Sequence, residues 1–418
     1  MSPLARLTQV GILQIHRRPY SPRTGGKGEG TTEQGERLAG PGTREDLLSE
    51  LPFTDEDVDD IDRRRTIKIG LFLPNWVGDV VMATPTLRTL REYYGNHHQL
   101  IGIMRPYVAE VLSGTNWLDD VILYDRRSGD KTMRGLSLIR QLRNRQLDSV
   151  LLFTNSLRSA VIARLSKIPQ RVGYVRYGRG LLLTEKLEPP RSGIRLSPIS
   201  ALDYYLNLAQ AVGASIDSRH TELATTTKND DQAAAIATRF GFRDSRPMIA
   251  LNTGGAYGAA KQWPVEYFAT LAQRLIHELE ANIIVLCGPS ETGSASRIEE
   301  LTNSDRVRTL ANESVSIGLS KAMVKRARLL ISTDSGPRHF GAAFDVPTIT
   351  LFGPTDPRWS ENYQEHAIHL SRDVPCGPCA NRKCPVAHHR CMRELTVDQV
   401  FHATVNLLKT TRPIRHVA

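Results

Sequence analysis

The sequence predicts an α/β protein with two Rossmann-like, doubly wound domains that face each other across a cleft. Apolar runs typical of strands alternate with segments of helical period, which indicates parallel sheets. This alternation starts at Ile67 and starts again at Met248, after the polar stretch Glu222–Asp231. At 418 residues the chain is long enough for two such domains, each with its own hydrophobic core.

The N-terminal residues 1–65 differ from the rest of the chain, and we expect a disordered or poorly structured tail there. They are rich in Gly, Thr, Arg and acidic residues without sustained periodicity, and the acidic run Asp55–Asp62 leads into three arginines. We therefore assign residues 66–225 to an N-terminal domain and residues 226–418 to a C-terminal domain. A final helix, expected over Val397–Leu408, would pack across the junction between them.

The expected elements follow in order along the two domains. In the first domain, a strand at Ile67–Leu73 leads through the loop Pro74–Asp79 into a helix with apolar residues at helical spacing. Further strands of this domain are expected at Leu100–Met104, Val121–Tyr124 and Ser149–Phe153. The second domain is expected to contain a helix over Pro264–Leu279 and strands at Met248–Asn252, Asn282–Cys287, Arg328–Thr333 and Thr348–Phe352.

The charge of the folded body indicates an anionic partner. Residues 67–418 carry 44 Lys and Arg against 32 Asp and Glu, which favours nucleic acid, a nucleotide-linked substrate or an acidic membrane surface. Nucleic acid is the weakest of the three, because the chain has no recognisable binding motif and only 6% aromatic residues. No apolar run approaches the roughly 18 residues of a membrane span, and no signal peptide is recognisable. We therefore expect a cytoplasmic protein.

The stretch Leu330–Phe344 is the most informative part of the chain. It reads as a buried strand, a tight Ser-Gly turn and a helix whose first turn begins at Pro337, where proline is favoured. Ser335 and Gly336 would then leave free backbone N–H groups between a strand end and a helix start, where α/β folds bind phosphate. An ordinary strand-to-helix turn would explain the same pattern, but a second polar loop with a lysine upstream favours a phosphate site.

Two side chains flank this turn. Asp334 would repel a phosphate, so we expect it to accept hydrogen bonds from sugar hydroxyls or from the backbone of its own turn. His339 either lines the same pocket or is a half-buried histidine whose hydrogen bonds are satisfied.

Asp79 ends the first strand-to-helix loop and is a candidate general base. A carboxylate at the mouth of the cleft could take a proton from an acceptor hydroxyl. Asn75 and Trp76 beside it suit a polar acceptor with one apolar face. The alternative interpretation is an N-cap, because aspartate is among the best residues for that position.

The loop Asn252–Pro264 follows the first strand of the second domain and is a candidate donor-binding loop. Its glycines permit close approach of the backbone to a ligand, which makes Thr253 and Gly254 candidate contacts. Lys261 is a candidate point charge for a diphosphate, and an exposed loop lysine is the alternative. The spacing is not that of a Walker motif, and no dinucleotide-binding glycine pattern follows the first strand.

Glu291 follows the expected strand Asn282–Cys287 and has two interpretations of equal weight. An acidic residue at such a strand end accepts hydrogen bonds from ribose hydroxyls in nucleotide-binding folds. An acidic residue in the first turn of a helix is also stabilised by the helix dipole.

Four separated segments together resemble glycosyltransferase family 9, and within it the ADP-heptose:lipopolysaccharide heptosyltransferases of type II. They are Pro74–Asp79, Ala260–Pro264, Thr333–His339 and Leu351–Pro357, and the likeness extends from about residue 66 to the end of the chain. It implies a GT-B fold and the inverting transfer of heptose from ADP-heptose to a core oligosaccharide on lipid A, with no cofactor required. Together with the basic body, it implies peripheral binding to the anionic inner face of the inner membrane.

The resemblance also assigns roles to the candidate residues. The N-terminal domain would bind the acceptor and the C-terminal domain the nucleotide sugar. Asp79 matches the family's proposed base and Lys261 its diphosphate contact. The other matches lie on the donor side: Asp334 for the sugar, Ser335 and Gly336 for the phosphates, and Glu291 for the ribose.

Two other functions are open from the residues alone. One is a GT-B transferase with a different nucleotide sugar or acceptor. The other is a catalytically idle protein that binds a nucleotide sugar. The presence of both Asp79 and Lys261 argues against the idle protein, because binding alone does not need both.

Four of the five cysteines form the cluster Cys376-x2-Cys379-x4-Cys384-x6-Cys391, which resembles one in type II heptosyltransferases. Such thiols can close a tetrahedral zinc site or hold an iron–sulfur cluster, and a disulfide framework is not expected in the cytoplasm. The short second spacing departs from common zinc motifs, so reduced, loop-stabilising cysteines are an equally good interpretation. We expect one structural unit away from the chemistry, with zinc as the candidate metal.

Overall fold

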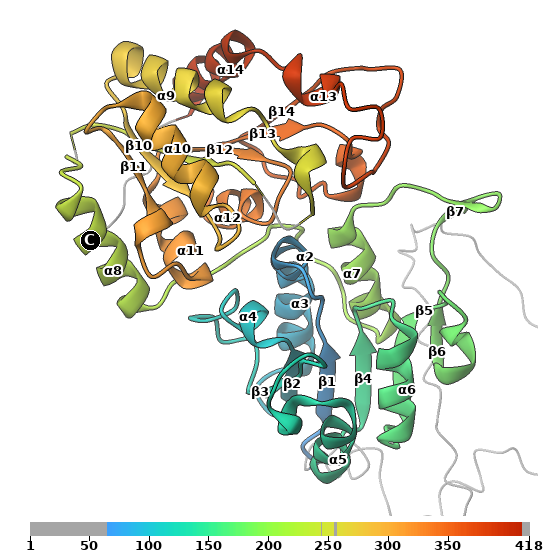
Figure 1. The fold of residues 1–418 in the computed structure, drawn as a ribbon. Helices are drawn as coiled ribbons and strands as arrows, with labels where there is room; N and C mark the ends of the chain where they lie inside the picture. Colours follow the sequence, from blue (N-terminus) through green and yellow to red (C-terminus); the bar gives the residue numbers. More distant parts are fainter. Residues whose placement is uncertain (1–64, 244, 255–256, 412–418) are drawn as a thin grey trace, which may run out of the picture. The chain divides into compact units, whose positions relative to one another are not determined.

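The computed structural model of the chain describes residues 65–243, 245–254 and 257–411. They belong to one compact unit that begins at Arg64, and they form two successive α/β halves (Figure 1). The tail expected at 1–65 lies outside the described residues, apart from Arg65.

The first half is built on a six-stranded sheet. Its strands are all parallel and lie in the order β3-β2-β1-β4-β5-β6. The strands are β1 (Lys68–Phe72), β2 (Gln99–Met104), β3 (Asp120–Leu123), β4 (Ser149–Leu152), β5 (Gln170–Tyr174) and β6 (Glu185–Leu187), and a small hairpin joins β7 (Arg191–Ser192) to β8 (Arg195–Leu196). The helices are α2 (Val77–Met82), α3 (Thr84–Tyr94), α4 (Pro106–Ala109), α5 (Gly135–Arg145), α6 (Leu157–Leu165) and α7 (Ala201–Ala211).

The second half repeats this plan. Its six parallel strands lie in the order β11-β10-β9-β12-β13-β14. They are β9 (Met248–Asn252), β10 (Asn282–Leu286), β11 (Val307–Thr309), β12 (Leu329–Thr333), β13 (Thr348–Phe352) and β14 (Ala367–Ser371). The helices are α8 (Thr227–Arg239), α9 (Val265–Leu279), α10 (Thr292–Thr302), α11 (Ile317–Arg326), α12 (Arg338–Ala343), α13 (Arg390–Arg393) and α14 (Val397–Thr410). Short 3-10 helices are η1 (Lys131–Met133), η2 (Arg179–Leu182), η3 (Ala259–Lys261), η4 (Leu310–Asn312) and η5 (Pro357–Trp359).

The first sheet is sandwiched between two layers of helices. On one face, buried residues of α5 and α6 such as Leu138 and Ala163 pack with Ile103 and Val150 of the sheet. On the other face, side chains of α2, α3 and α7 pack in a core that continues into the second half. None of the described helices is both long enough and apolar enough to cross a membrane.

The predicted α/β class with two doubly wound sheets is confirmed, and every strand expected from the sequence is present. The sequence analysis missed β5, β6, β11, β14 and the hairpin of β7 and β8. Three of the missed strands, β6, β11 and β14, are at sheet edges. An edge strand has a neighbouring strand on one side only, so its sequence does not need a continuous apolar run. The fourth, β5, has the sequence QRVGY, in which two polar residues and a glycine hide the strand pattern.

The topology places three loops at the points where strand order reverses. In the first sheet the order reverses between β1 and β4, and in the second between β9 and β12. Ligands of open α/β sheets bind outside the carboxyl ends of the strands at such points. The connections that follow β1, β9 and β12 start at these positions. They lead to Asp79 in the first turn of α2, to Lys261 in η3 and to Ser335.

The two halves meet closely at α2 and α12. A Cβ atom built on Gly78 would lie 2.7 Å from Cδ2 of His339 and 3.4 Å from Cα of Gly336. Real Cβ atoms are not found as close as the first of these distances, so a glycine is needed at position 78 for this packing. Main chain from the first half therefore lies directly against the turn that follows β12.

A buried lysine joins the halves at a second place. Nζ of Lys321, on α11, donates to the carbonyl oxygens of Val111, Ser113 and Ala224 at 2.9, 3.0 and 2.9 Å. Glu110, from the first half, in turn accepts a hydrogen bond of 3.0 Å from the first backbone N–H of α11. Burial lowers the pKa of Lys321 to about 8.

The final helix, α14, was expected to cross the junction. It packs on α9, β13 and β14 of the second half. Its buried side chains, among them Phe401 and Leu407, supply the apolar stripe for this contact. Trp263 anchors the start of α9 nearby, because its Nε1 donates to the carbonyl oxygen of Leu395 at 2.9 Å.

Candidate active site

A cavity of about 520 Å³ opens at the loops that follow β1, β9, β12 and β13. Residues of both halves line it. From the first half these are Trp76, Gly78, Asp79 and Met82, and from the second half Tyr257, Lys261, Asp334, Ser335, Gly336, His339, Thr355, Asp356, Trp359, Ser360, Pro378 and Ala380. Most of the residues proposed from the sequence therefore meet in one place.

Asp79 lies in the first turn of α2 and faces this cavity. The N-cap of the helix is Trp76, and no side chain caps it, so the capping interpretation of Asp79 is wrong. Burial raises the pKa of Asp79 to about 6, with Lys261 opposing the rise and Asp334 adding to it. Because no described side chain bonds to it, the carboxylate can accept a proton from a ligand.

Lys261 and Asp334 form a buried ion pair on the opposite wall. Nζ of Lys261 donates to Oδ2 of Asp334 at 2.6 Å and to the carbonyl oxygen of the same residue at 2.9 Å. The ammonium group also lies 4.3 Å from the ring centroid of Tyr257, a cation–π contact. Lys261 is therefore held in place, and one of its three N–H groups stays available to a ligand. It is not the exposed loop lysine of the alternative interpretation.

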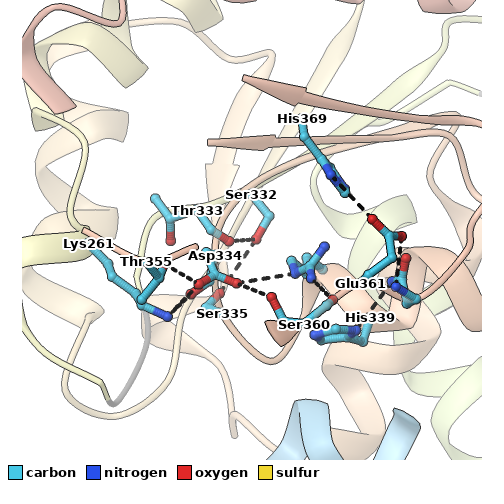
Figure 2. A network of polar contacts seen from close by, with 12 residues as sticks. Lys261, Ser332, Thr333, Asp334, Ser335, His339, Thr355, Ser360, Glu361 and His369 are labelled. Carbon is cyan, nitrogen blue, oxygen red and sulfur yellow. Dashed lines mark hydrogen bonds and ion pairs between the residues drawn. The ribbon is translucent and has the colours of Figure 1, made fainter. Parts of the chain in front are cut away.

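Asp334 is bound on several sides by protein groups (Figure 2). Thr355 Oγ1 donates to its Oδ2 at 2.6 Å, and Nε of Arg338 lies 3.3 Å from its Oδ1. Burial alone would raise the pKa of Asp334, but the charges of Arg338 and Lys261 and the hydrogen bonds lower it to about 2. We expected Asp334 to accept hydrogen bonds from sugar hydroxyls or from the backbone of its own turn, and these contacts were not part of that expectation. Its carboxylate first of all positions Lys261.

The Ser-Gly turn lies between β12 and α12, as predicted. Asn252 at the end of β9 holds it, because Nδ2 of Asn252 donates to Oγ of Ser335 at 2.6 Å and to Oγ of Ser332 at 2.9 Å. The backbone N–H groups of Ser335 and Gly336 donate to no described residue. Two N–H groups at the lip of the cavity are therefore available to an anion.

His339 is buried and also lines the cavity. The two interpretations from the sequence, a residue of the pocket and a buried histidine, are therefore both partly right. Its Nδ1 lies 3.2 Å from Nδ2 of Asn362. An amide nitrogen can only donate, so Nδ1 accepts and the ring hydrogen is on Nε2. Burial, with the charge of Arg338, holds the pKa of His339 well below its usual value.

Apart from the cysteines, four of the predicted site residues do not line this cavity. Glu291 and Gly254 are neighbours, but the Glu291 carboxylate accepts hydrogen bonds from the backbone N–H of Gly288 at 2.7 Å and from Oγ of Ser290 at 2.6 Å. Thr253 lines a separate cavity of about 310 Å³ between α9, α10 and α13. Asn75 presents its carbonyl oxygen to the hydroxyl of Tyr107.

The sequence analysis missed several residues of the site. Thr355, Asp356 and Ser360 come from the loop after β13, and Arg338 follows the Ser-Gly turn. The first two lie within the segment Leu351–Pro357, so a third polar loop after a strand was a signal for them. Nothing in the local pattern predicted Ser360, because its place depends on tertiary contacts.

The cysteine loop lies beside the site, and the expectation that it would be remote is wrong. Pro378 and Ala380 line the main cavity. The carbonyl oxygen of Arg382 accepts a hydrogen bond of 3.0 Å from the backbone N–H of Ala260, next to Lys261. The cysteine loop therefore supports the loop that carries the lysine.

The four clustered cysteines line one small cavity of about 20 Å³, together with His388 and His389. Burial raises the pKa of Cys391, and the neighbouring thiols add to the rise. Thiolate and imidazole are ligands that zinc prefers. No three of the described His, Cys, Asp or Glu side chains are, however, arranged to hold one metal ion.

Known proteins are similar to this chain over most of its length. The family model described as glycosyltransferase family 9 (heptosyltransferase) matches residues 135–389. The chain belongs to glycosyltransferase family 9. A family 9 relative, lipooligosaccharide heptosyltransferase 2 of Campylobacter jejuni, is 26% identical over 82% of this chain and 99% of its own length. Lipopolysaccharide heptosyltransferase 2 of Salmonella typhimurium is 28% identical over the same shares.

Solved structures confirm the fold of this family 9 glycosyltransferase. The E. coli ADP-heptose lps heptosyltransferase II superposes with a TM-score of 0.68 at 21% identity, over 82% of this chain and 99% of that one. An E. coli heptosyltransferase solved with ADP gives a TM-score of 0.62 at 18% identity, over 82% of this chain and 100% of that one. The predicted GT-B fold and the predicted family are both confirmed.

Proposed function

We propose that this family 9 enzyme transfers heptose from ADP-heptose to the inner-core oligosaccharide of lipopolysaccharide, with inversion at the anomeric carbon. One observation carries the proposal: a single cavity contains an unpartnered carboxylate from the first half and, from the second, a lysine and two free backbone N–H groups. The names of the relatives, which are heptosyltransferases of type 2, support the choice of sugar and acceptor.

The proposed reaction is a single displacement. An acceptor hydroxyl attacks the anomeric carbon, and its proton passes to the carboxylate of Asp79. The bond from that carbon to the diphosphate oxygen breaks on the opposite face, and ADP leaves with the electron pair. The free N–H of Lys261 and those of Ser335 and Gly336 stabilise the charge that grows on the diphosphate.

This arrangement needs only one carboxylate as a catalyst. A diphosphate leaves without protonation, whereas a sugar alkoxide requires a second acid, as in glycoside hydrolysis. Asp334 is unsuited to supply a proton, since its pKa is lowered to about 2.

A donor panel tests the proposed function. We expect ADP-heptose to raise the melting temperature of the protein, and to release ADP only when lipid A-linked core oligosaccharide is added. UDP- and GDP-sugars should do neither. A thermal shift and turnover with a UDP- or GDP-sugar instead would contradict the proposal and favour another GT-B transferase.

The rate should depend on the ionisation of Asp79. Because its pKa is about 6 and the base must be ionised, kcat should fall about tenfold per pH unit below about pH 6. The neighbouring groups Asp334 and His339 should not change their charge near pH 6, because Asp334 is already ionised there and His339 is neutral. The measurement is kcat at saturating substrates between about pH 5 and pH 8, and a flat profile there would exclude Asp79 as the base.

We also propose that the four clustered cysteines bind a structural zinc ion. Their shared cavity supports this, and the thiol groups would have to turn toward one another, because no three of the described side chains are arranged to hold a metal ion. No catalytic step needs the metal. Chelator-free protein without a His-tag should contain about one zinc per chain. Cys379→Ser should lower both the melting temperature and, through the loop of Lys261, the donor affinity. Metal-free protein whose melting is unchanged by chelator would leave reduced, packed thiols as the explanation.

The acceptor of this reaction is part of a lipid, so we further propose that the enzyme works at the inner face of the inner membrane. The excess of Lys and Arg over Asp and Glu in the body supports attraction to anionic lipid headgroups.

A further inference from the structure

The outer side of α6 (Leu157–Leu165) carries a stripe of apolar residues although it faces solvent. Leu157, Val161 and Leu165 have exposed fractions of 48, 36 and 48%. Their spacing of four residues puts them on one face of the helix. The opposite side is buried in the core beneath the first sheet, through Ala160, Ile162 and Ala163. The exposed side of the helix therefore carries three apolar residues that the fold does not bury.

Two elements next to α6 carry further exposed leucines. The helix α6 packs against α5 and η2, and each presents a leucine to solvent. Leu181 of η2 is 94% exposed and Leu136 of α5 is 75% exposed. We call Leu136, Leu157, Val161, Leu165 and Leu181 the apolar patch.

The segment of the chain that carries the apolar patch is strongly basic. Residues 131–184 include eleven Lys and Arg but a single acidic residue, Asp148, which pairs with Arg65 at 2.6 Å. Arg158 and Arg164 lie on the exposed side of α6. Neither forms an ion pair with a described acidic side chain, so their charges are uncompensated.

A further arginine lies at the end of the patch. The guanidinium of Arg143 on α5 donates two hydrogen bonds, of 3.0 and 2.7 Å, to the carbonyl oxygen of Leu165. Arg158 lies beside Gly135 at the other end of α5. Basic groups therefore border both ends of the exposed stripe of α6.

We propose that the apolar patch and its border of Arg143, Arg158 and Arg164 dock on the surface of an anionic lipid bilayer. Such a surface supplies hydrocarbon for leucine side chains and negative headgroups for arginines within a few ångströms of each other. A second copy of the chain fits poorly, because a symmetric contact would bring two positive faces together. The inference does not depend on which sugar the enzyme transfers.

Vesicle binding by the full-length protein tests this inference, without donor or acceptor. Wild type should sediment with phosphatidylglycerol vesicles and not with phosphatidylcholine vesicles. The triple variant Leu157→Ser/Val161→Ser/Leu165→Ser should bind phosphatidylglycerol vesicles at least about tenfold more weakly at any salt concentration. Arg158→Ala/Arg164→Ala should bind about tenfold more weakly at low salt, with the difference lost at high salt.

Matched controls separate this surface from general charge and polarity. Val121→Ser changes an exposed apolar residue on β3, and Lys228→Ala/Arg297→Ala removes two exposed charges from the second half. Both should bind like wild type, and all variants should melt like wild type because the changed side chains are exposed. If the triple variant has a lower melting temperature than wild type, vesicle binding by Arg158→Ala/Arg164→Ala is the result that tests the inference.

Three results would overturn the inference. Wild type could fail to sediment with the anionic vesicles. The triple variant and the arginine pair could bind as tightly as their controls. Light scattering could show a dimer that the triple variant converts to a monomer while vesicle binding is absent, in which case the patch joins two copies.

Discussion

Replacement of Asp79 by Asn should lower kcat by about 10²–10⁴-fold while donor binding is unchanged. The carboxylate faces the cavity without a hydrogen-bond partner among the described residues, and its raised pKa of about 6 suits a base that works near neutral pH. An amide of the same shape cannot take the proton of an acceptor hydroxyl. The measurement is steady-state turnover together with the melting shift caused by ADP-heptose.

Stability separates this loss from a structural defect. Burial disfavours the ionised form of Asp79 in the folded protein. Its ionisation therefore lowers the free energy of unfolding by about 3 kcal/mol at neutral pH, and this loss develops as the pH rises from about 4 through 6. Asp79→Asn should therefore be more stable than wild type at pH 7 and similar to it below about pH 4. Asp356→Asn, in the same cavity but bonded to Arg358, should lose far less turnover. Near wild-type turnover of Asp79→Asn would remove it from the mechanism.

Replacement of Lys261 by Ala should weaken donor binding and lower kcat by about 10²-fold or more. The lysine presents one free N–H to the diphosphate, where negative charge increases as ADP leaves, and the loss of one such donor typically costs about 10²–10³-fold. The change also leaves the buried Asp334 carboxylate with Arg338 as its charged neighbour and with the hydroxyls of Thr355 and Ser360 as its donors. The measurements are kcat, the KM for donor and acceptor, and the melting temperature without ligand.

A pair of variants separates these two effects of Lys261. Thr355→Val removes a hydrogen bond from Asp334 but leaves the lysine in place, so it should lower stability with a smaller effect on kcat. Lys261→Arg keeps the charge and should restore part of the donor affinity. The donor-side role of Lys261 would be refuted by a Lys261→Ala enzyme that differs from wild type only in acceptor saturation.

The central strands of both sheets were predictable because they are buried on both sides. The segments KIGLF, MIALN and LLIST are short apolar runs, and each is followed by a polar loop and a helical pattern. Edge strands such as β6, with the sequence EKL, contain no such run because only one side of each strand is paired. The sequence therefore predicted the fold class and missed the width of the sheets.

The candidate site was predictable where a residue lies between a strand and the next helix, or in the first turn of that helix. Asp79, Lys261 and Ser335 are all of this kind, and parallel strands bring such loops to one edge. The ion pair of Lys261 with Asp334 was not predictable, because it joins residues that are far apart in the sequence. The closeness of the cysteine loop to Lys261 depends in the same way on a tertiary contact, between Arg382 and Ala260.

The backbone contact at Gly78 has a consequence for natural variation. At this contact Gly78 lies against the ring of His339 and Gly336 against the side chain of Val77. There is little room for a side chain at either glycine, so the separation between the base and the lysine cannot be adjusted there by substitution. Even alanine at position 78 would displace the imidazole of His339 or push the halves apart. Gly78 should therefore be as intolerant of substitution in a mutational scan as a residue that touches substrate, although it has no side chain of its own to contribute to the chemistry.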